Sequence, residues 1–121
     1  MNAHAKVSEL PQQDRPISEE YRITAKRWID ADAAARIREE LKTTSLEKMK
    51  QDLINREGDM PDSHAERRVK AGDDWPEYIQ QMVDARTDAN RLKVQLEYIR
   101  MKFSEQQDFN ASARAEMKLG R

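Results

Sequence analysis

Basic side chains that could bind phosphate recur along one stretch in the second half of the sequence. Arg86, Lys93 and Arg100 are seven residues apart, so a helix would place them in one column. The complete set in this stretch is Arg86, Arg91, Lys93, Arg100 and Lys102. Such a column could contact a nucleic-acid backbone or an acidic protein. We favour an ordinary solvated helix face, because Asp88 and Glu97 interleave with these cations.

A second basic cluster, formed by Arg67, Arg68 and Lys70, falls in a short helix predicted over about residues 63–71. A short helix before a long one has the order of a helix-turn-helix motif. Its recognition helix would be only about eight residues long or part of a coiled coil, which suits reading of a DNA groove poorly. A solvated linker helix is therefore the favoured interpretation.

Residues suited to catalysis or metal binding are sparse. The two histidines, His4 and His64, lie far apart in the sequence, and neither belongs to a metal-ligand motif. The absence of cysteine excludes thiolate ligands, cysteine nucleophiles and disulfides. Neighbouring carboxylates such as Glu39 and Glu40 show no sign of the burial that would suit them to acid–base work. We therefore predict no catalytic residue, no cofactor and no metal, and hence no enzyme.

Charge and composition narrow the class of protein. The 22 basic and 23 acidic residues give a formal net charge of -1, which is neither the basic balance of many nucleic-acid-binding proteins nor the acidity of a DNA mimic. Charged residues make up 37% of the chain and the mean hydropathy is -1.04, as expected of long helices that bury one stripe. No apolar run suits a signal peptide or a membrane-spanning helix, so we expect a cytoplasmic protein with no membrane partner.

A heptad pattern of apolar residues organises the stretch from Trp75 to Phe103. Their spacing alternates between four and three residues over about four repeats, which predicts a long helix with a coiled-coil-like packing seam. The seam residues are Tyr78, Met82, Ala85, Ala89, Leu92, Leu96, Ile99 and Phe103. We expect this seam to support a homo-oligomer, with a dimer favoured, since a parallel pair would place Asp88 opposite Lys93. The helix is predicted over about residues 74–107, with continuation past that point as the alternative.

The first half of the chain is predicted to complete a single all-α domain over residues 17–121. Residues 1–16 contain two prolines and no periodicity, so they are predicted to form a flexible, disordered arm. A first long helix is predicted over about residues 18–57, begun by the capping residue Ser18. Its stretch 43–45 holds weak helix formers, where a kink is one alternative.

The predicted fold is a helical hairpin or coiled-coil-like bundle of two long helices with a short connecting helix. Ser63 and Glu66 have capping-box spacing at the start of that short helix. Trp28 and Trp75 are predicted core residues. Like charges disfavour a regular antiparallel hairpin, although apolar packing could override them. The columns predicted to oppose each other are Arg22, Arg36 and Lys50 against Arg86, Lys93 and Arg100.

Several stretches resemble a group of short phage and prophage proteins. The similar segments are Gly58-Asp59-Met60-Pro61, Ala65-Glu66-Arg67 with Val69-Lys70, Trp75, Leu96 to Gln106, and Arg114-Ala115-Glu116-Met117. The resemblance covers about residues 20–119. Members of this group lie among phage DNA-metabolism genes, which implies an early accessory role. The resemblance supplies no catalytic residue to carry over.

Taken with the residue patterns, this resemblance favours a non-enzymatic phage accessory protein. We expect it to bind a host or phage protein of DNA processing or host defence through a helical surface, and inhibition of a host nuclease or CRISPR complex is one version. The first alternative is an accessory protein of phage recombination or replication that binds nucleic acid with its basic helix face. The second alternative is a purely structural, oligomerising protein.

Overall fold

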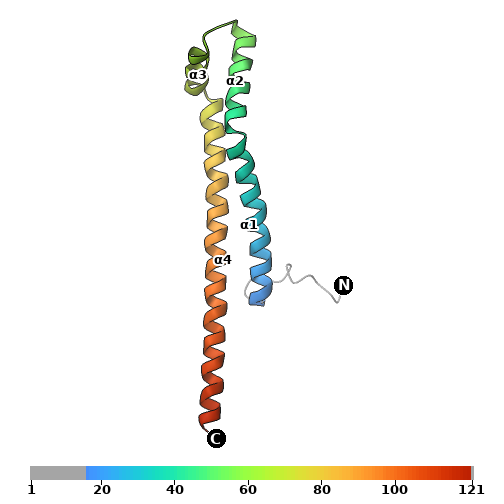
Figure 1. Ribbon diagram of the computed structural model, residues 1–121, viewed down its shortest axis with the longest axis vertical. Helices are drawn as coiled ribbons and strands as arrows, with labels where there is room; N and C mark the ends of the chain where they lie inside the picture. Colours follow the sequence, from blue (N-terminus) through green and yellow to red (C-terminus); the bar gives the residue numbers. More distant parts are fainter. Residues whose placement is uncertain (1–15, 121) are drawn as a thin grey trace, which may run out of the picture. The chain divides into compact units, whose positions relative to one another are not determined.

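The computed structural model describes residues 16–120, and all regular structure in this range is α-helical (Figure 1). The helices are α1 (Ile17–Glu40), α2 (Lys42–Glu57), α3 (Asp62–Ala71) and α4 (Asp74–Leu119). The predicted all-α class, with long helices joined through a short one, is confirmed. The predicted arm, residues 1–16, lies outside the described residues except for Pro16, which directly precedes α1.

In the first turns of α1 and α3, backbone amides donate hydrogen bonds to backbone carbonyls and not to the predicted capping side chains of Ser18 and Ser63. The carbonyl of Pro16 accepts from the amides of Glu19 and Glu20, so Ser18 lies within the first turn rather than before it. α3 begins at Asp62, one residue earlier than predicted, and no side chain caps it. The predicted capping box at Ser63 is therefore wrong.

The predicted first helix is interrupted at Leu41, which separates α1 from α2. Leu41 has φ -89° and ψ 4°, outside the helical range. Backbone hydrogen bonds continue on both sides, from the Leu41 amide to Ile37 at 3.0 Å and from the Ser45 amide to Leu41 at 2.8 Å. The interruption thus falls just before the weak stretch 43–45, and the end at Glu57 is as predicted.

The connection from α2 to α3 turns at Gly58, whose φ of 98° lies in the region that side-chain-bearing residues rarely adopt. The Gly58 amide still donates to the Ile54 carbonyl at 2.8 Å, which closes the last turn of α2. No heavy atom lies within 4 Å of the place a β-carbon would take there, so the backbone angle alone calls for glycine.

The long helix α4 continues without a break to Leu119 over 46 residues, which agrees with the alternative of a longer helix. The amide group of Asn110 does not interrupt it, because Asn110 Oδ1 accepts from Gln106 at 3.4 Å along the helix. The backbone carbonyl of Asn110 accepts from Arg114 Nε at 3.3 Å. No glycine or proline follows Pro76 until Gly120, so the helix meets no breaker.

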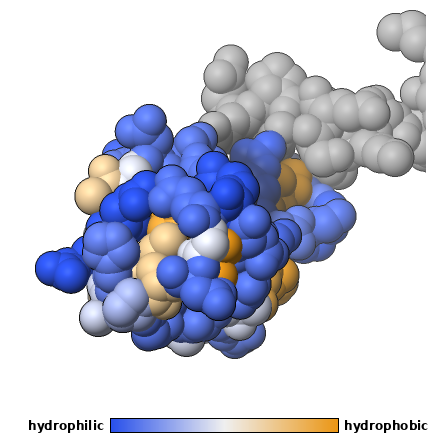
Figure 2. All heavy atoms as spheres, turned by 90° about the horizontal axis from the view of Figure 1, so that it is seen from above, coloured by the Kyte–Doolittle hydropathy of each residue, from blue (hydrophilic) through white to orange (hydrophobic). Residues whose placement is uncertain are grey.

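The chain forms two compact units, and both α1 and α4 contribute to each of them. One unit is residues 30–89, and the other is residues 1–29 with 90–121, of which 16–29 and 90–120 are described. Polar side chains cover most of the face shown in Figure 2, with apolar atoms in small groups between them. This pattern agrees with the low mean hydropathy of -1.04.

The core of residues 30–89 is built largely from small side chains. Its buried apolar residues are Ala35, Leu53, Ala65, Trp75 and Ala89, and the three alanines have no exposed surface. Trp75 stacks on Tyr78 with ring centroids 5.8 Å apart. The Tyr78 hydroxyl donates to the Arg38 carbonyl at 2.5 Å, close to the end of α1. Trp75 is therefore a core residue, as predicted, and Tyr78 joins α4 to α1.

The unit of residues 16–29 and 90–120 has a smaller buried set. Ile99 of α4 is 1% exposed, and Thr24 and Glu20 of α1 are also buried. Trp28 is only partly buried. From Ser104 to Leu119, α4 has exposed side chains throughout except at Ala113, which is partly buried. This last part of α4 therefore packs on little of the described chain.

Candidate functional site

Arg86, the first residue of the predicted basic column, is bound by two carboxylates of α1. Its Nε and Nη2 donate to the two carboxylate oxygens of Glu39 at 2.9 and 2.7 Å, and its Nη1 donates to Asp32 at 2.7 Å. These hydrogen bonds, to Glu39 first and Asp32 second, raise the pKa of Arg86. The hydrogen bond from Arg86 lowers the pKa of Glu39. A guanidinium held in this way has little capacity left for a phosphate.

The predicted clash of like charges between the long helices is wrong. Arg86 meets Asp32 and Glu39, which are seven residues apart on α1 and so lie on one side of that helix. Arg36, predicted to oppose the basic column, instead pairs with Asp32 of its own helix at 2.8 Å. Lys50, also predicted to oppose the basic column, instead pairs with Glu47 and Asp62. Opposite charges therefore join α1 to α4 within residues 30–89.

Lys50 is a buried cation that fastens α2 to the start of α3. It is 5% exposed, and its ammonium lies 2.7 Å from Asp62 and 2.9 Å from Glu47. The hydrogen bonds to Asp62 and then Glu47 raise the pKa of Lys50. Because Asp62 is the first residue of α3, this pair gives that helix a fixed start and an acidic first turn.

The second basic cluster also makes contacts within the chain. Arg68 donates to Glu57 at 2.8 Å, which joins α3 to the end of α2 and lowers the pKa of Glu57. Lys70 pairs with Glu66, one turn earlier in α3, at 3.3 Å. Arg67 is exposed and forms no ion pair with a described residue. Two of the three predicted cations thus have a structural role.

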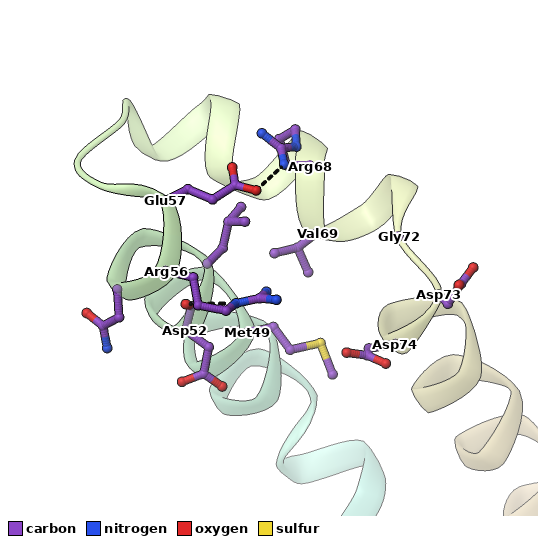
Figure 3. A pocket seen from close by; sticks show the side chains of 11 residues that line it. Met49, Asp52, Arg56, Glu57, Arg68, Val69, Gly72, Asp73 and Asp74 are labelled. Atoms are coloured by element: carbon purple, nitrogen blue, oxygen red, sulfur yellow. Dashed lines mark hydrogen bonds and ion pairs between the residues drawn. The ribbon is translucent and has the colours of Figure 1, made fainter.

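A polar pocket of about 650 Å³ lies beside Arg68 in residues 30–89 (Figure 3). Its walls come from α2, α3 and the start of α4, and they carry both charge signs. The charged lining residues are Asp52, Arg56, Glu57, Arg68, Asp73 and Asp74. Figure 3 shows Arg68 turned to Glu57, while Arg56 Nε bonds the backbone carbonyl of Asp52 at 3.3 Å. This mixed lining selects no one class of ligand.

A smaller, apolar pocket of about 290 Å³ lies between α1 and α4 in the other unit, beside Arg100 of the basic column. Its lining residues are Ile17, Ser18, Tyr21, Ile99, Arg100 and Phe103. Arg100 Nη2 donates to the Tyr21 hydroxyl at 3.1 Å, and this bond raises the pKa of Arg100. Phe103, the last residue of the predicted seam, is 45% exposed here. The seam therefore ends in an open pocket.

The remaining cations of the predicted basic face are exposed. Lys93 and Lys102 form no ion pair with a described residue, and Arg91 is also exposed on α4. Arg86 and Arg100, in contrast, bind side chains of α1. The column is therefore not a continuous row of available cations.

The predicted seam faces the interior of each unit. Ala89 and Ile99 are buried, and five other members are partly buried: Tyr78, Met82, Ala85, Leu92 and Leu96. Since Ile99 and Phe103 share a pocket with Ile17 and Tyr21, at least part of the seam packs against α1. Much of its apolar surface is thus used within the chain.

The opposite side of α4 carries large apolar side chains that the sequence analysis did not select. Val94, Tyr98, Met101 and Phe109 are 65%, 63%, 61% and 70% exposed. At about 100° per residue these four fall within an arc of about 80°, on the side away from the seam. We call these four residues the outer face of α4. Their spacings of four, three and eight residues are visible in the sequence. The heptad pattern of the seam is longer and more regular, so the sequence favoured the seam instead.

Comparison with protein-family models, curated proteins and solved structures finds no match. Within residues 16–120, no helix is long and apolar enough to cross a membrane. The same described range contains no group of three or more histidine, aspartate or glutamate side chains that could hold a metal ion.

Proposed function

We propose that this protein is a non-enzymatic accessory protein that binds another protein through the outer face of α4. The observation that carries this proposal is the set of four large apolar side chains, each more than 60% exposed, on one side of one helix. Single exposed apolar residues are ordinary on protein surfaces, whereas Val94, Tyr98 and Met101 lie on one side of the helix in successive turns, as the residues of an interaction site do. Tyr98 adds an aromatic side chain with a polar tip, a type enriched at interfaces.

Direct binding of nucleic acid is the second proposal. Arg67, Lys93 and Lys102 are exposed cations that could reach phosphates. We rank it lower because Arg86 and Arg68 are already held by carboxylates of the chain. A protein whose cations are paired internally has fewer phosphate contacts to make, and phosphate contacts supply most non-specific affinity.

The identity of the partner is a proposal that depends on the sequence resemblance. The similar phage and prophage proteins lie among DNA-metabolism genes, so we propose a DNA-processing or host-defence protein as the partner. Inhibition of a host nuclease or CRISPR complex would be one outcome of such binding. Self-association as a dimer, and a purely structural role, stay proposals that the mass of the protein in solution would test.

The experiment is an affinity pull-down of tagged full-length protein from host lysate, with and without nuclease treatment. We expect a protein partner that survives nuclease and is lost from the variant Val94→Gln/Tyr98→Gln/Met101→Gln. Glutamine keeps helix propensity while removing the apolar contact. The matched control is Ile29→Gln/Ile37→Gln/Val83→Gln, which changes three exposed apolar residues elsewhere and should retain the partner.

Two results would contradict this proposal. A partner recovered equally by both triple variants would show that the outer face is not its site. Recovery that disappears after nuclease treatment would favour nucleic acid instead. In that case DNA affinity should fall steeply as salt rises, because contacts with phosphates release counterions.

A further inference from the structure

Carboxylates accompany the apolar side chains of the outer face of α4. Glu97, Glu105 and Asp108 are exposed on the same side of the helix, between or beside the four apolar residues. Arg91, one turn before Val94, and Lys102 are the cations on this side, so the three carboxylates outnumber them. Glu105 and Asp108 form no ion pair with any described residue. Their charge is therefore available to a partner.

From these charges we infer that the outer face of α4 binds a basic amphipathic helix of its partner protein. This inference rests on the proposed function and adds the chemistry of the segment that docks. The apolar side of such a helix would cover Val94, Tyr98 and Met101, and its flanking lysines or arginines would meet Glu105 and Asp108. The flexible side chain of Met101 can adapt its shape to a helix laid across it, and Tyr98 adds a large aromatic contact surface.

The length of the face suits a helix rather than an isolated side chain. Residues 94–109 rise by about 22 Å at 1.5 Å per residue, which corresponds to about four turns of a partner helix. A second copy of the chain, packed in parallel and in register, is a poorer occupant. In a parallel, in-register pair, Glu105 would oppose Glu105 and Asp108 would oppose Asp108, and like charges at such positions are destabilising.

Two synthetic helices test this charge preference directly. Both would be about 18 residues long, with leucines alternately four and three residues apart, and their flanking positions would carry only lysine in one and only glutamate in the other. We expect the lysine peptide to bind the full-length protein at least about tenfold more tightly at low salt. Raising the salt concentration should narrow this ratio, because exposed charges are screened.

A charge-reversal variant separates the effect of charge from that of apolar contact. Glu105→Lys/Asp108→Lys should reverse the preference between the two peptides and weaken recovery of the native partner. Its matched control, Glu40→Lys/Asp59→Lys, makes the same change in net charge at exposed residues of the other unit. That control should keep the preference for lysine. Circular dichroism would verify that each variant keeps its helix content.

Equal binding of the two peptides, or tighter binding of the glutamate peptide, overturns the inference. If Val94→Gln/Tyr98→Gln/Met101→Gln still loses the native partner, the proposed function survives that result and only the chemistry of the segment is wrong. If the triple variant keeps its partner, the proposed function fails first. A protein that self-associates through this face and binds neither peptide would identify a second copy as the occupant.

Discussion

At the scale of single residues, two cations of the chain, Arg86 and Lys50, form ion pairs with carboxylates of the same chain. Arg86 uses three of its nitrogens on two carboxylates of α1, and Lys50 uses its ammonium on Asp62 and Glu47. A surface ion pair contributes little to stability, whereas a bidentate pair with a further partner fixes geometry. We therefore regard Arg86 as a residue that sets how α1 and α4 face each other within residues 30–89.

Replacing Arg86 should change how stability depends on pH. The folded-state pKa of Glu39 lies below its ordinary value of 4.5, because Arg86 donates hydrogen bonds to its carboxylate. A lowered folded pKa gives stability that is present above the unfolded pKa and is lost as pH falls through the folded pKa. Arg86→Met should therefore destabilise the protein at pH 7 and reduce its loss of stability on acidification below about pH 4.5.

Urea unfolding at neutral and acid pH would measure this difference. Arg67→Met is the matched control, since Arg67 is an exposed arginine that forms no ion pair with a described residue. That control should leave the acid sensitivity nearly unchanged. An Arg86→Met variant as sensitive to acid as the parent would show that the Glu39 pair does not govern acid stability.

At the scale of elements, α4 has two sides with different roles. Ile99 is 1% exposed on the side that meets α1, whereas Val94 is 65% exposed on the outer face only five residues earlier. One helix thus contributes a core stripe and, on its other side, the candidate docking face. Helix propensity cannot separate the two sides, because both mix strong helix formers such as leucine and methionine with weaker ones such as isoleucine, valine and tyrosine.

Truncating Ile99 should cost far more than truncating Val94. Ile99→Ala removes a fully buried side chain from a small core, so we expect a loss of about 2–5 kcal/mol in the free energy of unfolding. Val94→Ala, on the exposed side, should change it by about 0.5 kcal/mol or less. Denaturant titration of both variants gives the comparison. Similar losses in the two would mean that the outer face is packed in solution.

At the scale of the whole molecule, both units draw on the same two continuous helices. One part of α1 and one part of α4 belong to the unit of residues 30–89, and the rest of each helix belongs to the other unit. Helix formation is cooperative along a continuous segment. The predicted single domain over residues 17–121 is therefore best tested by whether the units unfold together.

The two tryptophans allow this test, because Trp28 belongs to one unit and Trp75 to the other. In the variants Trp75→Phe and Trp28→Phe, fluorescence follows one unit at a time. Within each variant we expect the fluorescence midpoint in urea to coincide with the midpoint from circular dichroism, as in two-state unfolding. A fluorescence midpoint separated from the helix signal in either variant would show that the units melt independently.

The sequence predicted the all-α class and the apolar seam of α4, because helical periodicity is local and strong. The heptad pattern predicted a homo-oligomer through this seam, whereas much of it is buried within the chain. The predicted pairing of charges between α1 and α4 was wrong, because a small rotation of one helix about its axis decides whether Arg86 lies opposite Arg36 or Asp32. Asp32 and Glu39 carried a usable signal in their seven-residue spacing. The capping box at Ser63 failed because α3 begins one residue earlier, at Asp62, which pairs with Lys50 of α2.

The sequence shows the spacing of the outer-face residues of α4 but does not show that they are exposed. Val94, Tyr98 and Met101 lie among seam residues, and a pattern alone cannot say which of two apolar stripes is covered. The interruption at Leu41 was nearly located, because 43–45 holds weak helix formers. Its position two residues earlier coincides with the hydrogen bond from Tyr78 to Arg38, a contact between residues distant in sequence.

The turn at Gly58 between α2 and α3 has a backbone conformation that D residues favour and L residues rarely adopt. Its φ of 98° and ψ of 173° are the mirror image of ordinary extended backbone, and no heavy atom lies within 4 Å of where the β-carbon of an L residue would be. L-alanine there would be strained by about 1–3 kcal/mol. D-alanine would adopt this conformation naturally and would also restrict the unfolded chain. A chemically synthesised protein with D-alanine at 58 should therefore be at least as stable as the natural one, and its L-alanine counterpart less stable.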